Sequence, residues 1–473
     1  MKLFPHIRLY VLPNVVGLRF HVFVINRNAS YLQFNAGAAD PLAMTAHLRL
    51  ASVSLGRAPL FFALQANARQ SSSGQSEVEI PPPKRSSLSS VFERGTGGRC
   101  SFSGNTCTVF GATGMVGTAL LARIAKTGTQ LIVPYRRDQY DCRHLWVSGE
   151  LGQIYYIPYF LKDDDAIRRA LKYSNLVVNL VGAGYETKNF SFYDVHVDAA
   201  RRIAKLSREM GVQHLVHFSA MNANVEPDEC YIPGGSQFLK TKALGEIAVR
   251  EEFPNAVIIR PANIYCYTDQ FINVYMNVFR RQFYFSIGLH AFGEDTYKAP
   301  VWLSDVISGT TRVLFDPSTA GETFEFVGPY SYQLGNLVEW MYELNSRGRD
   351  RGFRREGFGI LFTIKTLIAE MYSRVFRCPP TWNWEYIERV ETISDVLTGC
   401  KTLEDLGIIP EPFEEKSLTT LEVYDFAASF RTCKEELVHP EPPIRYEHMR
   451  AKDAVPKPIE RRLRRTQRAV AFA

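Results

Sequence analysis

A glycine-rich turn between an apolar run and a helical pattern constrains the fold of this chain more than any other feature. Residues 106–117 read TCTVFGATGMVG, so a β-branched strand leads directly into Gly111, Gly114 and Gly117. The first glycine permits a tight turn, the second lets backbone approach a pyrophosphate, and the third allows a helix to pack closely on a strand. The following helix would direct its N-terminal N–H groups at the phosphates. The segment predicts a dinucleotide-binding turn, with the spacing GxxGxxG in place of the commoner GxGxxG.

Apolar runs and helical patterns alternate after this turn. Strands are expected near 106–110, 130–135, 153–157, 175–181, 214–219 and 256–260, and helices near 115–127, 164–172, 195–210 and 236–252. This alternation predicts an α/β fold, a Rossmann-type doubly wound parallel sheet, over residues 105–330. A smaller α-rich C-terminal region is expected over 331–437, followed by an extended basic tail over 438–473.

Composition excludes several classes of protein. Hydrophobic residues make up 46% and charged residues 22%, which is typical of a globular chain, and a net charge of +6 is too small to imply nucleic acid. The eight cysteines include no Cys-x-x-Cys pair, so neither a metal site nor a disulfide framework is expected and a reducing compartment is favoured. No run of 18 apolar residues predicts a membrane-spanning helix.

The first 75 residues have the composition of a mitochondrial targeting region. They are rich in arginine and serine and contain one acid, Asp40. From Met44 onward, leucines alternate with Arg49 and Arg57, so a short helix would be apolar on one side and cationic on the other. We expect Met44 to be the working start, with residues 1–43 upstream of it; a disordered basic tail is the alternative. Residues 76–104 are rich in Ser, Gly and Pro and are expected to be a linker.

Other cofactor contacts are expected where the strands end. The second strand ends in VPYRR at 133–137, and arginine there suits the 2′-phosphate of NADPH, whereas an acid would suit NAD. A solvated loop is the alternative for Arg136 and Arg137. The predicted cofactor-binding residues are Gly111, Thr113, Gly114, Met115, Val116, Gly117, Tyr135, Arg136, Arg137, Phe160, Leu161, Leu180, Val181, Gly182, Ser219, Ala220, Lys242, Pro261, Ala262, Asn263 and Ile264.

Residues 238–242 read FLKTK, in the place where a short-chain dehydrogenase carries Tyr-x-x-x-Lys. In that pattern the tyrosine gives a proton to the developing oxyanion, and the lysine one helical turn later lowers its pKa. Phe238 keeps the ring without the hydroxyl, and Lys242 remains. No catalytic residue is therefore predicted, and the cofactor is expected to be structural. Tyr231, in a Gly/Pro-rich loop, is either a replacement donor or a surface tyrosine.

These residues resemble the atypical, extended short-chain dehydrogenase/reductases, and more closely the nucleotide-binding accessory subunits of mitochondrial complex I. The resemblance covers about residues 100–425, with matching motifs at 109–114, 132–136, 186–190, 206–212, 238–242, 326–329 and 403–408. It implies tightly held NADPH, no turnover, other complex I subunits as partners, and a place on the matrix side of the inner membrane. There the subunit would brace the junction of the matrix and membrane arms.

The chain departs from the superfamily pattern at two predicted contacts. Phe160 replaces an acid that contacts the adenine, so that contact would fall to backbone near Leu161. His196 replaces an asparagine that relays protons through a water. The resemblance therefore implies a weakened adenine contact and an uncertain relay.

The C-terminal region carries possible docking elements. A helix is expected over 334–346, and the basic run 347–355 precedes an apolar segment at 357–369 that is too short to span a bilayer. That segment predicts contact with inner-membrane lipid or a partner; a buried core helix is the alternative. Trp382 and Trp384 would anchor at lipid or simply pack. The arginines of the tail could meet anionic lipid, ribosomal RNA or an acidic neighbour, and no nucleic acid is expected because no aromatics are interleaved.

Two other functions stay open from the sequence. One is a working NADP-dependent reductase or epimerase of the mitochondrial matrix. The other is an RNA-associated relative of the same fold.

Overall fold

The computed structural model describes residues 100–277, 280–281, 286–344, 353–376, 382–424 and 440–451, residues 95, 98 and 380, and the backbone of 8–12 and 21–25. The chain divides into two units, residues 1–81 and 82–473. In the first, β1 (Arg8–Leu12) pairs antiparallel with β2 (His21–Ile25). The targeting helix expected from Met44, most of the basic run 347–355 and the terminal arginines lie outside the described residues.

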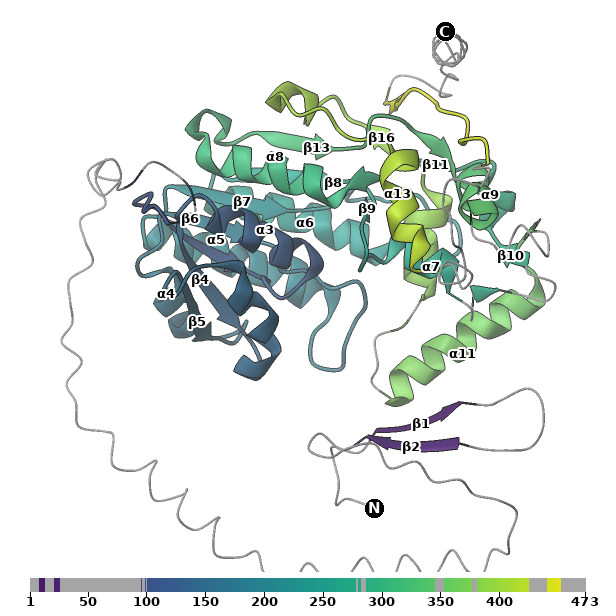
Figure 1. Ribbon diagram of the computed structural model, residues 1–473, viewed down its shortest axis with the longest axis horizontal. Coiled ribbons are helices and arrows are strands. Elements are labelled where there is room, and N and C mark those ends of the chain that lie inside the picture. Colours follow the sequence, from purple (N-terminus) through teal and green to yellow (C-terminus); the bar gives the residue numbers. More distant parts are fainter. Residues whose placement is uncertain are drawn as a thin grey trace, which may run out of the picture. The chain divides into compact units, whose positions relative to one another are not determined.

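The larger unit is built on an eight-stranded sheet in the order β17-β13-β8-β7-β6-β3-β4-β5, with every neighbouring pair parallel (Figure 1). Its central strands are continuous buried runs because helices cover both faces. This architecture confirms the predicted Rossmann-type sheet. The strands are β3 (Thr106–Phe110), β4 (Gln130–Tyr135), β5 (Ile154–Pro158), β6 (Leu176–Asn179), β7 (His214–Phe218), β8 (Val257–Pro261), β13 (Thr323–Phe326) and β17 (Lys401–Thr402).

Two helical layers enclose this sheet. On one face, α3 (Met115–Ala125) and α8 (Leu303–Phe315) pack on each other and on the sheet. The other face carries α4 (Asp164–Leu171), α5 (Ala199–Glu209) and α6 (Gln237–Glu252), and a π-helical turn at Asp194–Asp198 leads into α5. The expected helices are all present within a few residues of their predicted bounds.

A second apolar core lies beyond the carboxyl ends of the strands and includes most of the C-terminal region. Its helices are α7 (Phe271–Met276), α9 (Leu334–Leu344), α12 (Trp384–Ile387), the π-helical turn Glu388–Thr392 and α13 (Phe413–Glu422). Short strand pairs support it: β9 (Ile264–Tyr265) with β12 (Val301–Trp302), β10 (Ser286–Gly288) with β15 (Arg354–Glu356), β11 (Tyr297–Lys298) with β14 (Tyr332–Gln333), and β16 (Val396–Leu397) with β18 (Met449–Arg450). The 3-10 helices are Gln139–Ser148, His290–Gly293, Pro317–Thr319 and Glu404–Leu406. Strand β17, with Leu403 and Leu406 in the core around the sheet, also joins the C-terminal region to the sheet directly.

Helix α11 (Ile360–Phe376) is labelled in Figure 1. It differs from the other described helices because most of its apolar side chains are exposed. Within it only Phe362 and Thr366 are buried, and Trp382 donates its indole N–H to the Thr366 hydroxyl. The alternative of a buried core helix is therefore wrong for this segment. No described helix is both long and apolar enough to cross a bilayer.

Candidate functional site

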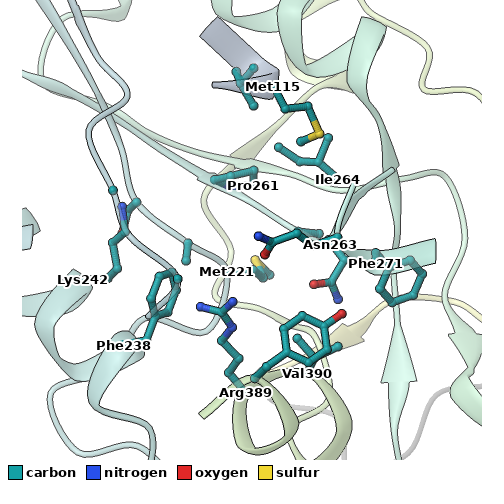
Figure 2. A pocket seen from close by; sticks show the side chains of 18 of the residues that line it. Met115, Met221, Phe238, Lys242, Pro261, Asn263, Ile264, Phe271, Arg389 and Val390 are labelled. Carbon is teal, nitrogen blue, oxygen red and sulfur yellow. The ribbon is translucent and has the colours of Figure 1, made fainter. Parts of the chain in front are cut away.

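A cavity of about 570 Å³ opens at the carboxyl ends of the parallel strands, beside the glycine turn. Its position is the switch point of the sheet, where β3 has β4 on one side and β6 on the other, and such crevices bind nucleotides in doubly wound folds. Figure 2 shows the lining side chains converging from the sheet and from the C-terminal region. The lining includes Gly111, Gly114, Met115, Val116, Gly117, Leu180, Gly182, Ser219, Ala220, Lys242, Pro261, Ala262, Asn263 and Ile264, all named from the sequence.

Each glycine of the turn meets a different steric demand. Gly111 has φ +79°, and a Cβ there would stand 3.0 Å from the Leu180 carbonyl at the end of β6. At Gly117 a Cβ would lie 2.6 Å from Ala112 Cα, closer than real side chains come to backbone. At Gly114 the nearest protein atom would be 3.4 Å away. Gly111 and Gly117 are thus required by the packing of the protein itself, whereas Gly114 leaves free backbone facing the cavity.

The N-terminus of α3 faces this cavity without a competing group. Gly114 is the N-cap and supplies no side-chain hydrogen bond, and the first turn contains no acidic residue. The first N–H groups of a helix have no partner within the helix and carry partial positive charge. The turn and helix together therefore suit a phosphate or pyrophosphate.

Phe238 and Lys242 lie on one face of α6, and both line the cavity. Lys242 is buried and its Nζ donates to the Phe218 carbonyl at 3.0 Å, at the end of β7. Burial lowers the pKa of Lys242 to about 8, against the opposing charge of Glu246. This ammonium lies 5.9 Å from the centroid of the Phe238 ring.

His196 is held neutral with both ring nitrogens engaged. The Ala183 N–H donates to Nε2 at 3.2 Å, so the proton is on Nδ1, which lies 2.9 Å from the Thr241 hydroxyl. Its ring also packs edge-on against Phe238, 5.1 Å between centroids. Neither nitrogen is left to hold a relay water, so the position implied by the resemblance as a proton relay serves packing here.

Two buried polar atoms near Lys242 have no hydrogen-bond partner among the described residues. They are Ser219 Oγ, in the cavity wall, and His217 Nε2, in β7. A buried hydroxyl without a partner costs free energy. Ser219 therefore presents an unsatisfied group to whatever fills the cavity.

Seven of the predicted cofactor residues lie outside this lining. Arg136 and Arg137 are exposed just after β4, and Phe160 is 68% exposed after β5. Leu161 is buried, and its carbonyl accepts from Arg202 at 2.8 Å. The others are Thr113, which is exposed in the turn, Tyr135 at the end of β4, and Val181, which is buried after β6. The five at or just after the ends of β4 and β5 lie on the side where the adenine half was expected, and all seven contacts remain predictions.

The structure adds cavity residues that the sequence did not indicate. Arg389, Tyr386 and Val390 come from α12 and the π-helical turn after it, about 150 residues beyond Phe238. The Arg389 Cζ lies 4.1 Å from the centroid of the Phe238 ring and 5.4 Å from that of Tyr386. No local pattern links these residues to the glycine turn, so only the folded chain reveals them.

A buried ion pair closes another side of the cavity. Lys298 Nζ lies 2.9 Å from Asp395 Oδ1, and the Ala299 N–H donates to Asp395 Oδ2 at 3.0 Å. The Asn222 amide also donates to Asp395 Oδ1, at 3.3 Å. Lys298 and Asp395 both line the cavity and neutralise each other.

Tyr231 does not stand where a replacement proton donor would be needed. Its hydroxyl hydrogen-bonds His290 Nδ1 at 2.7 Å, and its ring packs near Phe358 and Trp384. It is absent from the cavity lining. The geometry supports the packing role for Tyr231, and Trp382 and Trp384 likewise pack within the protein. No group of three His, Cys, Asp or Glu in the described part of the chain is placed to hold a metal ion.

The neutral histidines predict a loss of stability in acid. Burial, and next the charge of Lys242, lowers the pKa of His196 to about 2 and that of His217 to about 3. The unfolded chain protonates both near pH 6.5, so stability is complete above that value and is lost as the pH falls toward the folded-state pKa values. We expect the free energy of unfolding to fall by up to about 1.4 kcal/mol per pH unit for each histidine.

Chemical denaturation of His217→Gln and wild-type protein at pH 7.5 and 5.5 measures this effect. The variant should lose less stability on acidification than the wild type. His144→Gln is the control, because His144 is exposed and its substitution should leave the pH dependence unchanged. An equal pH dependence in the wild type and His217→Gln would contradict the prediction.

Comparison with known proteins agrees with this geometry. Residues 107–286 match the NAD dependent epimerase/dehydratase family. The chain is 37% identical over 334 residues to NADH dehydrogenase (ubiquinone) 1 alpha subcomplex subunit 9, mitochondrial, of Mus musculus, covering 70% of this chain and 83% of that one. It is 34% identical to the mitochondrial NADH-ubiquinone oxidoreductase 40 kDa subunit of Neurospora crassa, covering 72% and 83%. The subunit 9 protein of Dictyostelium discoideum is 30% identical, with 69% and 87% covered. The chain therefore belongs to the family of NADH dehydrogenase (ubiquinone) 1 alpha subcomplex subunit 9.

Proposed function

We propose that this chain is a non-catalytic accessory subunit of mitochondrial respiratory complex I that holds NADPH as a structural cofactor. The observation that carries the proposal is the cavity itself, which keeps the glycine turn and Lys242 while Phe238 replaces the proton donor. The relatives of this family are named as mitochondrial subunits of NADH dehydrogenase. Other complex I subunits are accordingly its partners, on the matrix side of the inner membrane, where it stabilises the junction of the matrix and membrane arms.

The residues present fit a nicotinamide dinucleotide. The uncapped N-terminus of α3 and Gly114 would hold the pyrophosphate, and Lys242 and Ser219 offer donors to the nicotinamide half. Arg136 and Arg137 are exposed beside the place expected for the adenine ribose, which supports NADPH over NADH. A dinucleotide bound here would supply a hydride carrier, which these side chains hold in place.

Turnover would need a proton donor in the place of the tyrosine hydroxyl, and Phe238 offers none. Tyr386 lines the cavity, but its hydroxyl is buried without a hydrogen-bond partner among the described residues. Burial also raises its pKa, so it gives up a proton less readily than an ordinary tyrosine. Loss of a positioned general acid typically lowers a rate by about 10²–10⁴-fold. Residual reduction of a carbonyl, the activity of the alternative reductase or epimerase, would therefore be slow.

The exposed face of α11 supports contact with the lipid surface of the inner membrane. The exposed residues of α11 are uncharged except for Arg374. The two other charged residues of the helix are half-buried: Lys365 donates to the Arg281 carbonyl, and Glu370 accepts from the Trp384 N–H. An apolar face of this kind marks a binding surface, and a helix too short to span can lie in a membrane interface. We propose that α11 rests on the bilayer while the rest of the unit contacts protein subunits.

A native gel of detergent-solubilised mitochondria tests the proposal, with nucleotide extracted from the band that contains this chain. Migration with complex I and about one NADPH per chain, not consumed during NADH oxidation, is the expected result. A small free species whose nucleotide is oxidised by added carbonyl compounds would favour the reductase. A free species that binds RNA in a salt-dependent way would favour the RNA-associated alternative.

A further inference from the structure

Two cations flank Phe238 inside the cavity, and neither is paired with an acid of the described lining. The charged residues of the lining are Lys242, Lys298, Arg389 and Asp395, and Asp395 is already paired with Lys298. Arg389 and Lys242 lie 4.1 and 5.9 Å from the centroid of the Phe238 ring. Figure 2 shows the Arg389 guanidinium directed into the group of lining side chains, with Phe238 beside it.

Arg389 is free of polar contacts within the described part of the chain. No hydrogen bond or ion pair joins it to another described residue, and its Nη1 is buried without a partner. The neighbouring carboxylate of Glu385 accepts from the Ser236 hydroxyl and from the Phe238 N–H. Glu385 therefore attracts the Arg389 guanidinium without bonding to it, and the unpartnered Nη1 leaves a charged donor available to a bound molecule.

The charge of Lys242 is also only partly balanced. The acid whose charge acts on Lys242 is Glu246. Glu246 also accepts two hydrogen bonds from Arg260, at 3.0 and 2.7 Å. Lys242 itself makes its hydrogen bond to a backbone carbonyl. Its ammonium therefore adds to the positive potential that Arg389 creates.

Apart from the Glu385 carboxylate, the remaining groups near Phe238 add little negative charge. Phe238 cannot ionise, His196 is neutral, and burial raises the pKa of Tyr386. Asp269 lies between two lining residues, but its Oδ2 accepts from the Ile272 N–H at the start of α7, and burial raises its pKa to about 7. The end of the cavity around Phe238 is therefore a positively charged environment for a bound ring.

This end is the one that would receive the nicotinamide half, because the glycine turn fixes the pyrophosphate and the adenine-side residues lie outside the cavity. The oxidised nicotinamide ring carries a positive charge and the reduced ring is neutral. We propose that Arg389, supported by Lys242, makes the cavity select the reduced form of the dinucleotide over the oxidised form. The inference rests on the proposed cofactor and adds the residue that makes the cavity favour its reduced form.

The test compares the dissociation constants of NADPH and NADP⁺ for the full-length chain by equilibrium dialysis. The two forms differ only at the nicotinamide ring, so the ratio of their affinities is independent of the adenine and phosphate contacts. We expect NADPH to bind on the order of tenfold more tightly or better, the scale of one unit charge acting across a partly buried site. Arg389→Met should reduce this ratio several-fold, mainly by strengthening NADP⁺ binding.

Matched variants separate charge from packing. Arg389→Lys keeps the charge and should keep the preference, and Arg143→Met removes an exposed arginine that stacks on Tyr140 outside the cavity and should change nothing. Equal binding of the two forms by the wild type, or a ratio unchanged in Arg389→Met, overturns the inference while leaving the proposed cofactor intact. Binding of neither form overturns the proposed cofactor and the inference together.

Discussion

Gly114→Ala is expected to remove tight dinucleotide binding while leaving the protein folded. The added Cβ would meet no protein atom closer than 3.4 Å, so the turn can accept it. The same atom would project from backbone that faces the cavity at the N-terminus of α3, where a pyrophosphate must approach the N–H groups closely. Overpacking of a close contact costs about 1–3 kcal/mol, which corresponds to roughly a ten- to hundredfold loss of affinity.

Gly117→Ala should behave differently, because the conflict is inside the protein. Its Cβ would stand 2.6 Å from Ala112 Cα and from the Gly111 carbonyl oxygen. Backbone cannot move aside as a flexible side chain does, so α3 must shift from β3, and both stability and binding should fall. Gly359→Ala is the control, since a Cβ there meets nothing within 4 Å and the site is outside the cavity.

Chemical unfolding and NADPH titration of the three variants separate the two effects. Gly114→Ala should keep the stability of the wild type and bind NADPH weakly. Gly117→Ala should lose both stability and NADPH affinity, and Gly359→Ala should change neither. Wild-type affinity in Gly114→Ala would show that the pyrophosphate does not lie on this turn.

The sequence predicted the half of the cavity that is built from local patterns. The strand, the glycine turn and the helix at 106–125 are consecutive in the chain, so their spacing reports the geometry directly. The same holds for Phe238 and Lys242, one helical turn apart on α6. Each of these patterns lies within a short stretch of sequence, so it can be recognised without knowing how distant segments pack.

The other half of the cavity depends on contacts between distant segments. Arg389 and Asp395 reach the site from the C-terminal region, and Lys298 reaches it from β11, because the second apolar core lies at the carboxyl ends of the strands. Strand β17 has only two residues, too few to show a period, although it extends the main sheet. Hydrophobicity also fails to tell whether an apolar helix faces its own core or a partner, and α11 proves to be exposed.

The double substitution Leu367→Glu, Met371→Glu on α11 is expected to abolish membrane binding without unfolding the chain. Both side chains are more than half exposed, and neither belongs to an apolar core of the larger unit. The four-residue spacing places them on one face of the helix. Insertion of this face into the bilayer would then lose two apolar contacts and bury two carboxylates. We therefore expect the partition of the chain onto vesicles to fall roughly a hundredfold or more.

Flotation of the full-length chain with vesicles of phosphatidylcholine alone measures the change, because uncharged lipid does not attract the basic ends of the chain. Val147→Glu is the matched control, because Val147 is 84% exposed but lies on the 3-10 helix Gln139–Ser148, far from α11 in sequence and outside the C-terminal core. Retained flotation in the α11 variant would contradict lipid contact through this face. Loss of migration with complex I but unchanged flotation would instead assign the same face to a protein subunit, because the apolar side chains that bury against lipid would bury equally well against another apolar surface.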